Sequence, residues 1–65
     1  MFDRPEVLRL IATMSSIYGI QAVLDQCGVP EEDRGDVIAE AMTSAVEGTD
    51  LWFALAELAE EYPAE

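Results

Sequence analysis

The chain has 65 residues with a net charge of −11, because 14 residues are Asp or Glu, three are Arg, and none is Lys or His. This charge argues against direct binding of nucleic acid or of an anionic membrane surface, whose phosphate groups would be repelled. The length allows one domain, residues 1–65, and a single Cys without His excludes an internal disulfide and a Cys/His metal cluster.

The first predicted element is a long helix over residues 4–27. Asp3 is placed to cap it, Pro5 suits its first turn, and Glu6 would complete a capping box with Asp3. Gly28 suits the left-handed position that commonly follows the last residue of a helix. These signals predict both ends of one helix.

Apolar side chains fall on two faces of this predicted helix, given about 100° per residue. The first stripe consists of Val7, Leu10, Ile11, Met14 and Tyr18. The second stripe, which points to the other side, consists of Ile20, Val23, Leu24 and Cys27. Either the chain bends or breaks near Gly19, so that both stripes face one core, or a straight helix buries each stripe against a different neighbour. Gly19 itself would allow close packing or a kink.

A small domain without a disulfide or a metal is marginally stable, and oligomerisation is one way to stabilise it. The second stripe is therefore predicted to mediate self-association through Ile20, Val23, Leu24 and Cys27. A homodimer is the expected oligomeric state.

Residues 31–47 and 50–62 are predicted to form two shorter helices that fold back against the first. The apolar face of the former consists of Val37, Ile38, Ala41, Met42 and Ala45, and Gly48 is expected to end it. Thr49 is expected to cap the latter, whose core stripe consists of Leu51, Leu55, Leu58 and Tyr62. The predicted fold is all-α, a small three-helix domain with a long first helix.

Acidic residues are predicted to line the outward faces of the last two helices. Carboxylates one helical turn apart are separated by about 5–6 Å, on a scale comparable to that of successive phosphates on a nucleic-acid strand. Phe53 is predicted to lie among these acids, where an aromatic side chain can anchor an interface. The predicted partner-binding residues are Asp33, Asp36, Glu40, Glu47, Phe53, Glu57, Glu60 and Glu61.

The residue types do not favour an enzyme. A nucleophile at Ser15 or Cys27 would lack a histidine base, and acidic pairs one turn apart are typical of any solvated helix face, so no catalytic residue, cofactor or metal is expected. No apolar run is long enough for a membrane span, and the N-terminus lacks the pattern of a signal peptide, so a cytoplasmic location is expected.

The favoured hypothesis is a non-enzymatic module that binds a basic protein surface, mimics nucleic acid and blocks a groove on a nucleic-acid-handling complex. Small phage inhibitors of host defence complexes are similar in size and charge, although no motif is shared. The alternative is a structural or adaptor module that oligomerises or binds a partner through apolar helix faces. In a third interpretation, the charge serves only solubility or adaptation to a high-salt cytoplasm.

Overall fold

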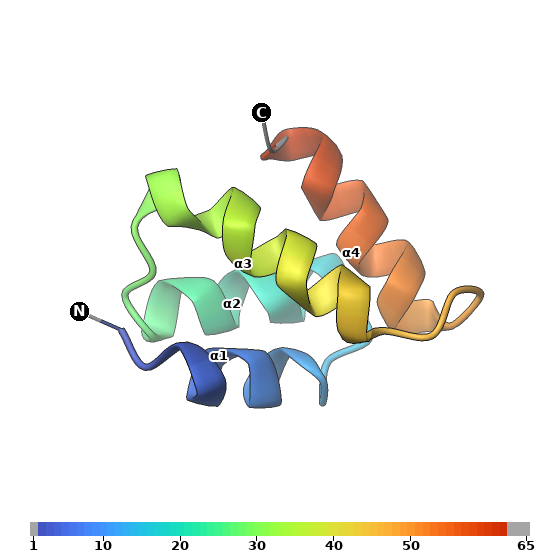
Figure 1. Ribbon diagram of the computed structural model, residues 1–65, viewed down its shortest axis with the longest axis horizontal. Helices are drawn as coiled ribbons and strands as arrows, with labels where there is room; N and C mark the ends of the chain where they lie inside the picture. Colours follow the sequence, from blue (N-terminus) through green and yellow to red (C-terminus); the bar gives the residue numbers. More distant parts are fainter. Residues whose placement is uncertain (1, 63–65) are drawn as a thin grey trace.

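The computed structural model describes residues 2–62, and this part of the chain forms four α-helices and no β-strand. The helices are α1 (Arg4–Ile11), α2 (Ile17–Gln26), α3 (Glu31–Ser44) and α4 (Asp50–Glu61) (Figure 1). Helix α1 packs against α2 and α3, and α4 packs against the same two helices. The all-α prediction is therefore confirmed, and the predicted count of three helices is wrong.

The predicted helix over residues 4–27 is two helices separated by residues 12–16. The turn after α1 is closed by the Thr13 hydroxyl group, which donates to the carbonyl oxygen of Leu10 at 2.7 Å. Ser16 then caps α2 by accepting a hydrogen bond from Gly19 N at 3.2 Å. Ser and Thr side chains compete with helical hydrogen bonds in this way, which explains why the helix stops here. The break lets α2 run back antiparallel to α1 (Figure 1).

Gly19 lies after this break, in the first turn of α2. A Cβ atom at this position would lie 3.0 Å from Met14 Sδ, which is tighter than most such contacts and would require the Met14 side chain to shift. Glycine therefore lets the 12–16 linker pack tightly onto α2. The close neighbours of Gly19 are side chains of the linker and not another helix, and the predicted break near Gly19 lies a few residues earlier, at residues 12–16.

Because the chain folds back, the second apolar stripe lies in the chain's own core. Ile20 and Leu24 are fully buried, Val23 is 5% exposed, and Cys27 is half-buried against them. The prediction that these residues form a self-association surface is wrong, because the same chain already covers them. They consequently give no support for a homodimer.

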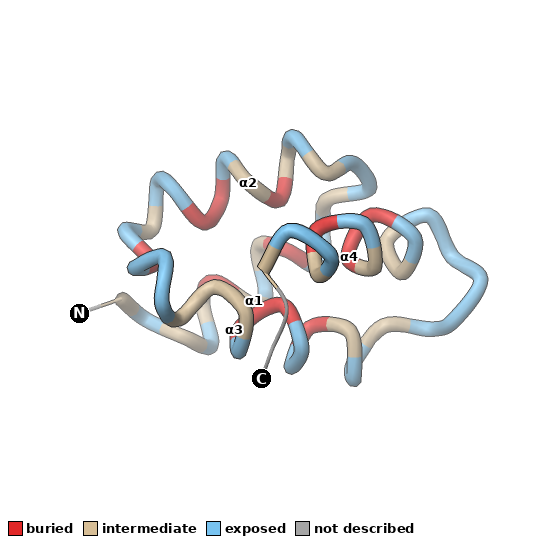
Figure 2. The backbone as a smooth tube through the Cα atoms, turned by 90° about the horizontal axis from the view of Figure 1, so that it is seen from above, coloured by how far each residue is buried: buried red, intermediate tan, exposed pale blue. Residues whose placement is uncertain are grey.

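All four helices contribute to one apolar core, along their inward sides (Figure 2). The buried residues are Val7, Ile11, Ile20, Val23, Leu24, Val29, Val37, Ile38, Ala41, Ala54, Leu55 and Leu58. No polar or charged residue among residues 2–62 is buried. Every described carboxylate therefore lies at the surface.

Two of the predicted helix ends are confirmed. Gly28 has a φ of 70°, and the amides of Gly28 and Val29 donate to the carbonyl oxygens of Asp25 and Leu24, which together form a Schellman motif. Thr49 caps α4 by accepting a hydrogen bond from Trp52 N at 3.2 Å.

The first helix begins at Arg4 with Pro5 in its first turn, as predicted, but the predicted capping box is wrong. The Asp3 side chain makes no capping hydrogen bond, and Glu6 pairs with Arg9. The predicted end of the second predicted helix at Gly48 is also wrong. Helix α3 ends at Ser44, before Gly48, and Ala45 is extended. The Ser44 hydroxyl group donates to a carbonyl oxygen one turn back, as Ser and Thr side chains do where helices bend or end. Glu47 consequently lies in the α3–α4 loop.

Candidate protein-binding surface

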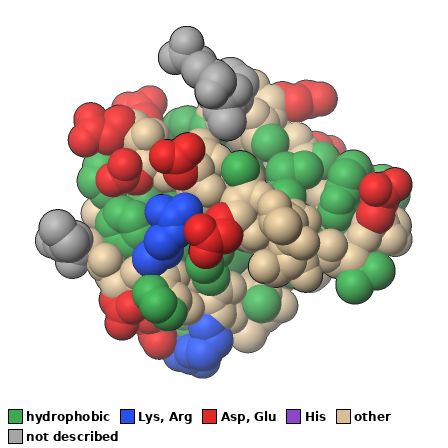
Figure 3. Space-filling view, viewed as in Figure 1, with side chains coloured by type: hydrophobic (Ala, Val, Ile, Leu, Met, Phe, Trp, Pro, Cys, Tyr) green, Lys and Arg blue, Asp and Glu red, His purple; other side chains and the backbone are tan. Residues whose placement is uncertain are grey.

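All three arginines of the chain are paired with carboxylates. The pairs are Arg4 with Glu40, Arg9 with Glu6, and Arg34 with Asp25. The described acidic residues without an arginine partner are Asp3, Glu31, Glu32, Asp33, Asp36, Glu47, Asp50, Glu57, Glu60 and Glu61. Acidic side chains are spread over much of the face drawn in Figure 3. The surface of the described residues therefore presents unpaired negative charge and no unpaired arginine.

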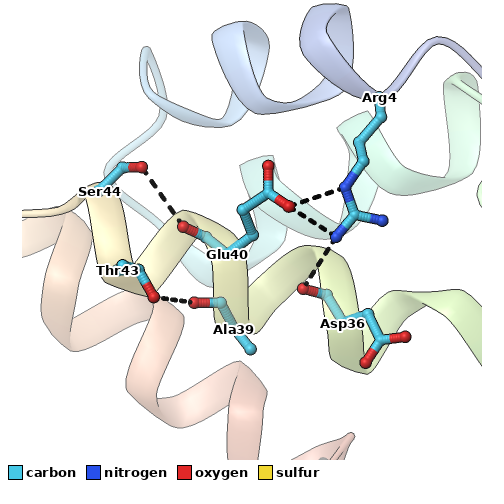
Figure 4. Close-up of polar contacts among 6 residues, drawn as sticks. All are labelled: Arg4, Asp36, Ala39, Glu40, Thr43 and Ser44. Carbon is cyan, nitrogen blue, oxygen red and sulfur yellow. Dashed lines mark hydrogen bonds and ion pairs between the residues drawn. The ribbon is translucent and has the colours of Figure 1, made fainter.

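The Arg4–Glu40 pair joins α1 to α3 (Figure 4). Arg4 Nη2 lies 2.8 Å from Glu40 Oε1, Arg4 Nε donates to the same oxygen at 2.9 Å, and Arg4 Nη2 also approaches the carbonyl oxygen of Asp36 at 3.5 Å. Glu40, predicted to bind a partner, is thus already engaged within the molecule. The Glu40 side chain is 46% exposed, so this pair contributes no more than about 1 kcal/mol to stability.

Arg34 joins the end of α2 to α3. Its Nη2 donates to Asp25 Oδ1 at 2.7 Å and its Nε donates to the carbonyl oxygen of Val29 at 3.1 Å, with only 16% of the side chain exposed. The hydrogen bond that Arg34 donates to Asp25 raises the pKa of the Arg34 guanidinium above its ordinary value. Similarly, the hydrogen bond with Glu6 raises the pKa of Arg9. These groups stay charged and serve the fold.

The acids of α3 gather at its first turn. Glu31, Glu32 and Asp33 lie there, and Asp36 follows on the exposed side. Negative charge at the start of a helix is stabilised by the helix dipole, so these acids have a structural reason to be where they are. The predicted acidic row along this helix is shorter than expected, because Glu40 is paired and Glu47 lies outside the helix.

The acids of α4 gather at its opposite end. Glu57, Glu60 and Glu61 are exposed, the last two lie in the final turn, and that turn contains no basic residue. Negative charge at the end of a helix is destabilised by the helix dipole. Gln21 Nε2 donates a hydrogen bond to Glu61 at 3.2 Å, but the amide is neutral and leaves the negative charge of Glu61 in place. The charge at this end of α4 therefore works against helix stability.

A hollow of about 340 Å³ lies between the start of α2 and α4. It is lined by Ser15, Ser16, Ile17, Tyr18, Asp50, Phe53, Ala54 and Glu57. The Phe53 side chain is 56% exposed, as predicted, and the Trp52 ring meets its ring edge-on, with centroids 5.8 Å apart at 87°. The Phe53 ring therefore lines the hollow while it contacts a second aromatic ring. The hollow thus brings aromatic rings and carboxylates together.

Tyr18 is the member of this surface that periodicity missed. It was predicted to belong to the first apolar stripe, but it is 81% exposed. The break at residues 12–16 changes the direction of the chain, so Tyr18 no longer continues the face formed by Val7 and Ile11. The Ser15–Ser16 pair just before it, a cap signal, was the sequence feature that could have revealed this.

Among residues 2–62, no group of three or more Cys, Asp or Glu side chains is arranged to bind a metal ion. The described helices also include none with the length and apolar character required to cross a bilayer. Compared with known proteins, the chain matches no protein-family model, no curated protein and no solved structure.

Proposed function

We propose that the protein is a non-enzymatic module that binds a basic surface of another protein through the acidic end of α4, and that it competes there with nucleic acid. The observation that carries this proposal is the position of Glu57, Glu60 and Glu61 toward the wrong end of a helix for stability. A cationic partner would offset both the helix dipole and the mutual repulsion of these carboxylates.

The surrounding charge supports the same proposal. The chain carries a net charge of −11, and each of its arginines is used in an internal pair. A field of one sign steers an oppositely charged partner toward the surface and raises the association rate. A protein that binds nucleic acid presents the type of basic surface that this field would attract.

The adaptor function remains a second candidate because the surface also carries exposed apolar side chains. Tyr18, Val46 and Phe53 are 81%, 70% and 56% exposed, respectively. A partner held mainly by these side chains would stay bound at high salt, whereas a partner held by carboxylates would be released.

The test compares two double variants in a capture experiment from cells of the source organism. Glu57→Gln/Glu60→Gln removes two charges from α4, and the control Glu31→Gln/Glu32→Gln removes two charges from the start of α3. We expect the wild type to retain a basic nucleic-acid-handling protein at low salt and to release it at about 0.5 M salt. The α4 variant should retain at least about tenfold less of this protein than the control does. A nucleic-acid duplex should release the captured protein from the wild type.

Stability measurements on the same variants separate loss of binding from loss of folding. The α4 variant should be slightly more stable than the wild type, because it relieves the unfavourable dipole interaction of Glu60 and the repulsion between Glu57 and its acidic neighbours. The α3 variant should be slightly less stable, by about 0.3–1 kcal/mol per charge at most, because it removes favourable interactions with the dipole at the helix start. A partner that resists high salt, a partner that is not basic, or equal losses in both variants would overturn the proposal.

A further inference from the structure

We propose that the hollow between α2 and α4 binds an arginine side chain of a basic partner, with its guanidinium group against the Tyr18 and Phe53 rings and within reach of Asp50 and Glu57. This inference rests on the proposed function and specifies where a basic partner would be recognised. The first supporting observation is that two aromatic side chains from distant parts of the sequence line one hollow while staying largely exposed. Exposed aromatic rings at a concave surface are typical of interface anchors.

The chemistry of the lining favours a cation over other ligands. Among the described residues that line the hollow, the charged ones are Asp50 and Glu57, and neither pairs with an arginine. Aromatic faces attract cations through their quadrupole, and carboxylates add a full negative charge. The occupant is therefore expected to carry positive charge.

Arginine fits this lining better than lysine does. Its guanidinium group is planar, stacks on aromatic faces and can donate two parallel hydrogen bonds to a carboxylate. The lysine ammonium group is more strongly hydrated and lacks a flat surface. A hollow that combines rings and carboxylates therefore selects for arginine.

The starts of α2 and α4 also lie beside the hollow, and a helix start by itself attracts anions. Here each cap occupies one N–H group of its helix start, because Ser16 accepts from Gly19 N and Thr49 accepts from Trp52 N. Asp50 further compensates the first turn of α4. The two full carboxylate charges at the hollow outweigh the partial charges of the capped helix starts.

The backbone positions that carry the rings are set before any partner binds. Phe53 lies on α4 and contacts Trp52, and Tyr18 lies in the first turn of α2, two residues after the Ser16 cap. A backbone that is already folded in its binding geometry loses little conformational freedom on association. The hollow therefore requires no rearrangement of the helices to accept a guanidinium group.

The probes for the test are three hexapeptides made of arginine, lysine or citrulline, titrated into isotopically labelled protein and followed by NMR. Citrulline has the shape of arginine without its charge. We expect the arginine peptide to bind and to shift the Tyr18 and Phe53 ring signals most. The lysine peptide should bind about two- to fivefold more weakly, and the citrulline peptide should not bind detectably.

Variants then locate the binding site. Phe53→Leu and Tyr18→Leu keep apolar side chains at exposed positions, and each should weaken binding of the arginine peptide about two- to fivefold. Glu57→Gln should weaken it more than the control Glu47→Gln, which removes the same charge from the α3–α4 loop. Amide spectra of each variant should match those of the wild type, which shows that the fold is retained.

The outcomes separate this inference from the proposed function. If the arginine and lysine peptides bind equally, and the leucine variants bind as the wild type does, the hollow is not the binding site, although binding of basic partners stands. If ring shifts are largest elsewhere, the inference also fails. If neither basic peptide binds at low salt, both the inference and the proposed function are overturned.

Discussion

The α1–α3 edge and the α2–α4 edge both join helices that are distant in the sequence, but they differ in how they use charge. At the α1–α3 edge, the Arg4 guanidinium group neutralises Glu40 and also reaches a backbone carbonyl group (Figure 4). At the α2–α4 edge, the polar link is a hydrogen bond from the neutral Gln21 side chain to Glu61. The first edge is joined by an ion pair, and the second has unpaired carboxylates beside the larger hollow.

The two edges share one apolar core and differ only in the charged side chains at their surface. The buried residues on both sides belong to one cluster, so burial alone does not distinguish the edges. What distinguishes them is that α1 and α3 carry the arginines, whereas α2 and α4 carry none. The proposed function assigns the cationic partner to the edge whose helices carry no arginine.

The largest expected effect tests whether the two edges share one core. Ile11 in α1 and Ile20 in α2 are 1% and 0% exposed, respectively, so Ile11→Ala and Ile20→Ala should each reduce the free energy of unfolding by about 2–5 kcal/mol. Urea denaturation followed by circular dichroism measures this change. Ala22→Ser, at an exposed position in α2, is the control and should change it by less than about 0.5 kcal/mol. A loss under about 1 kcal/mol for either isoleucine would show that its helix is peripheral.

A smaller effect is expected from opening the paired edge. Arg4→Met keeps an apolar stem and removes the ion pair with Glu40, so the free energy of unfolding should fall by up to about 1 kcal/mol. The loss should shrink in high salt, which already screens the pair in the wild type. A loss of several kcal/mol would mean that this edge depends on Arg4 for more than charge.

The smallest effect is expected from closing the open edge. Gln21→Arg places a guanidinium group beside Glu61, where the glutamine amide already donates, and should raise the free energy of unfolding by a few tenths of a kcal/mol. The same change should weaken capture of a basic partner, because it neutralises a carboxylate at the proposed surface. Stronger capture by Gln21→Arg would contradict the assignment of binding to this edge.

Much of the local structure could be predicted because it depends on neighbouring residues. The left-handed conformation of Gly28 and the Thr49 cap follow from residue types at fixed offsets from a helix end. The exposure of Phe53 follows from its position opposite Leu51 and Leu55 on the same helix. Each of these features can be read within a few residues of sequence.

The break at residues 12–16 could not be read in this way. Both halves of the 4–27 segment have helical periodicity. The Ser16 cap favours a break over a continuous helix, but the free energy of this local preference is small enough for tertiary packing to override it. Once the break is in place, Ile20 and Leu24 enter the shared core and Tyr18 leaves it. The predicted self-association surface and the missed aromatic residue therefore have the same cause.

By itself, the sequence determined that this protein is helical, strongly acidic and without the residues for a Cys/His metal cluster, because composition and local periodicity decide these properties. Only the tertiary structure decided which carboxylates are paired and which aromatic rings share a hollow. These outcomes depend on contacts between helices far apart in the chain, such as Arg4 with Glu40 and Tyr18 beside Phe53, and no local pattern encodes such distances.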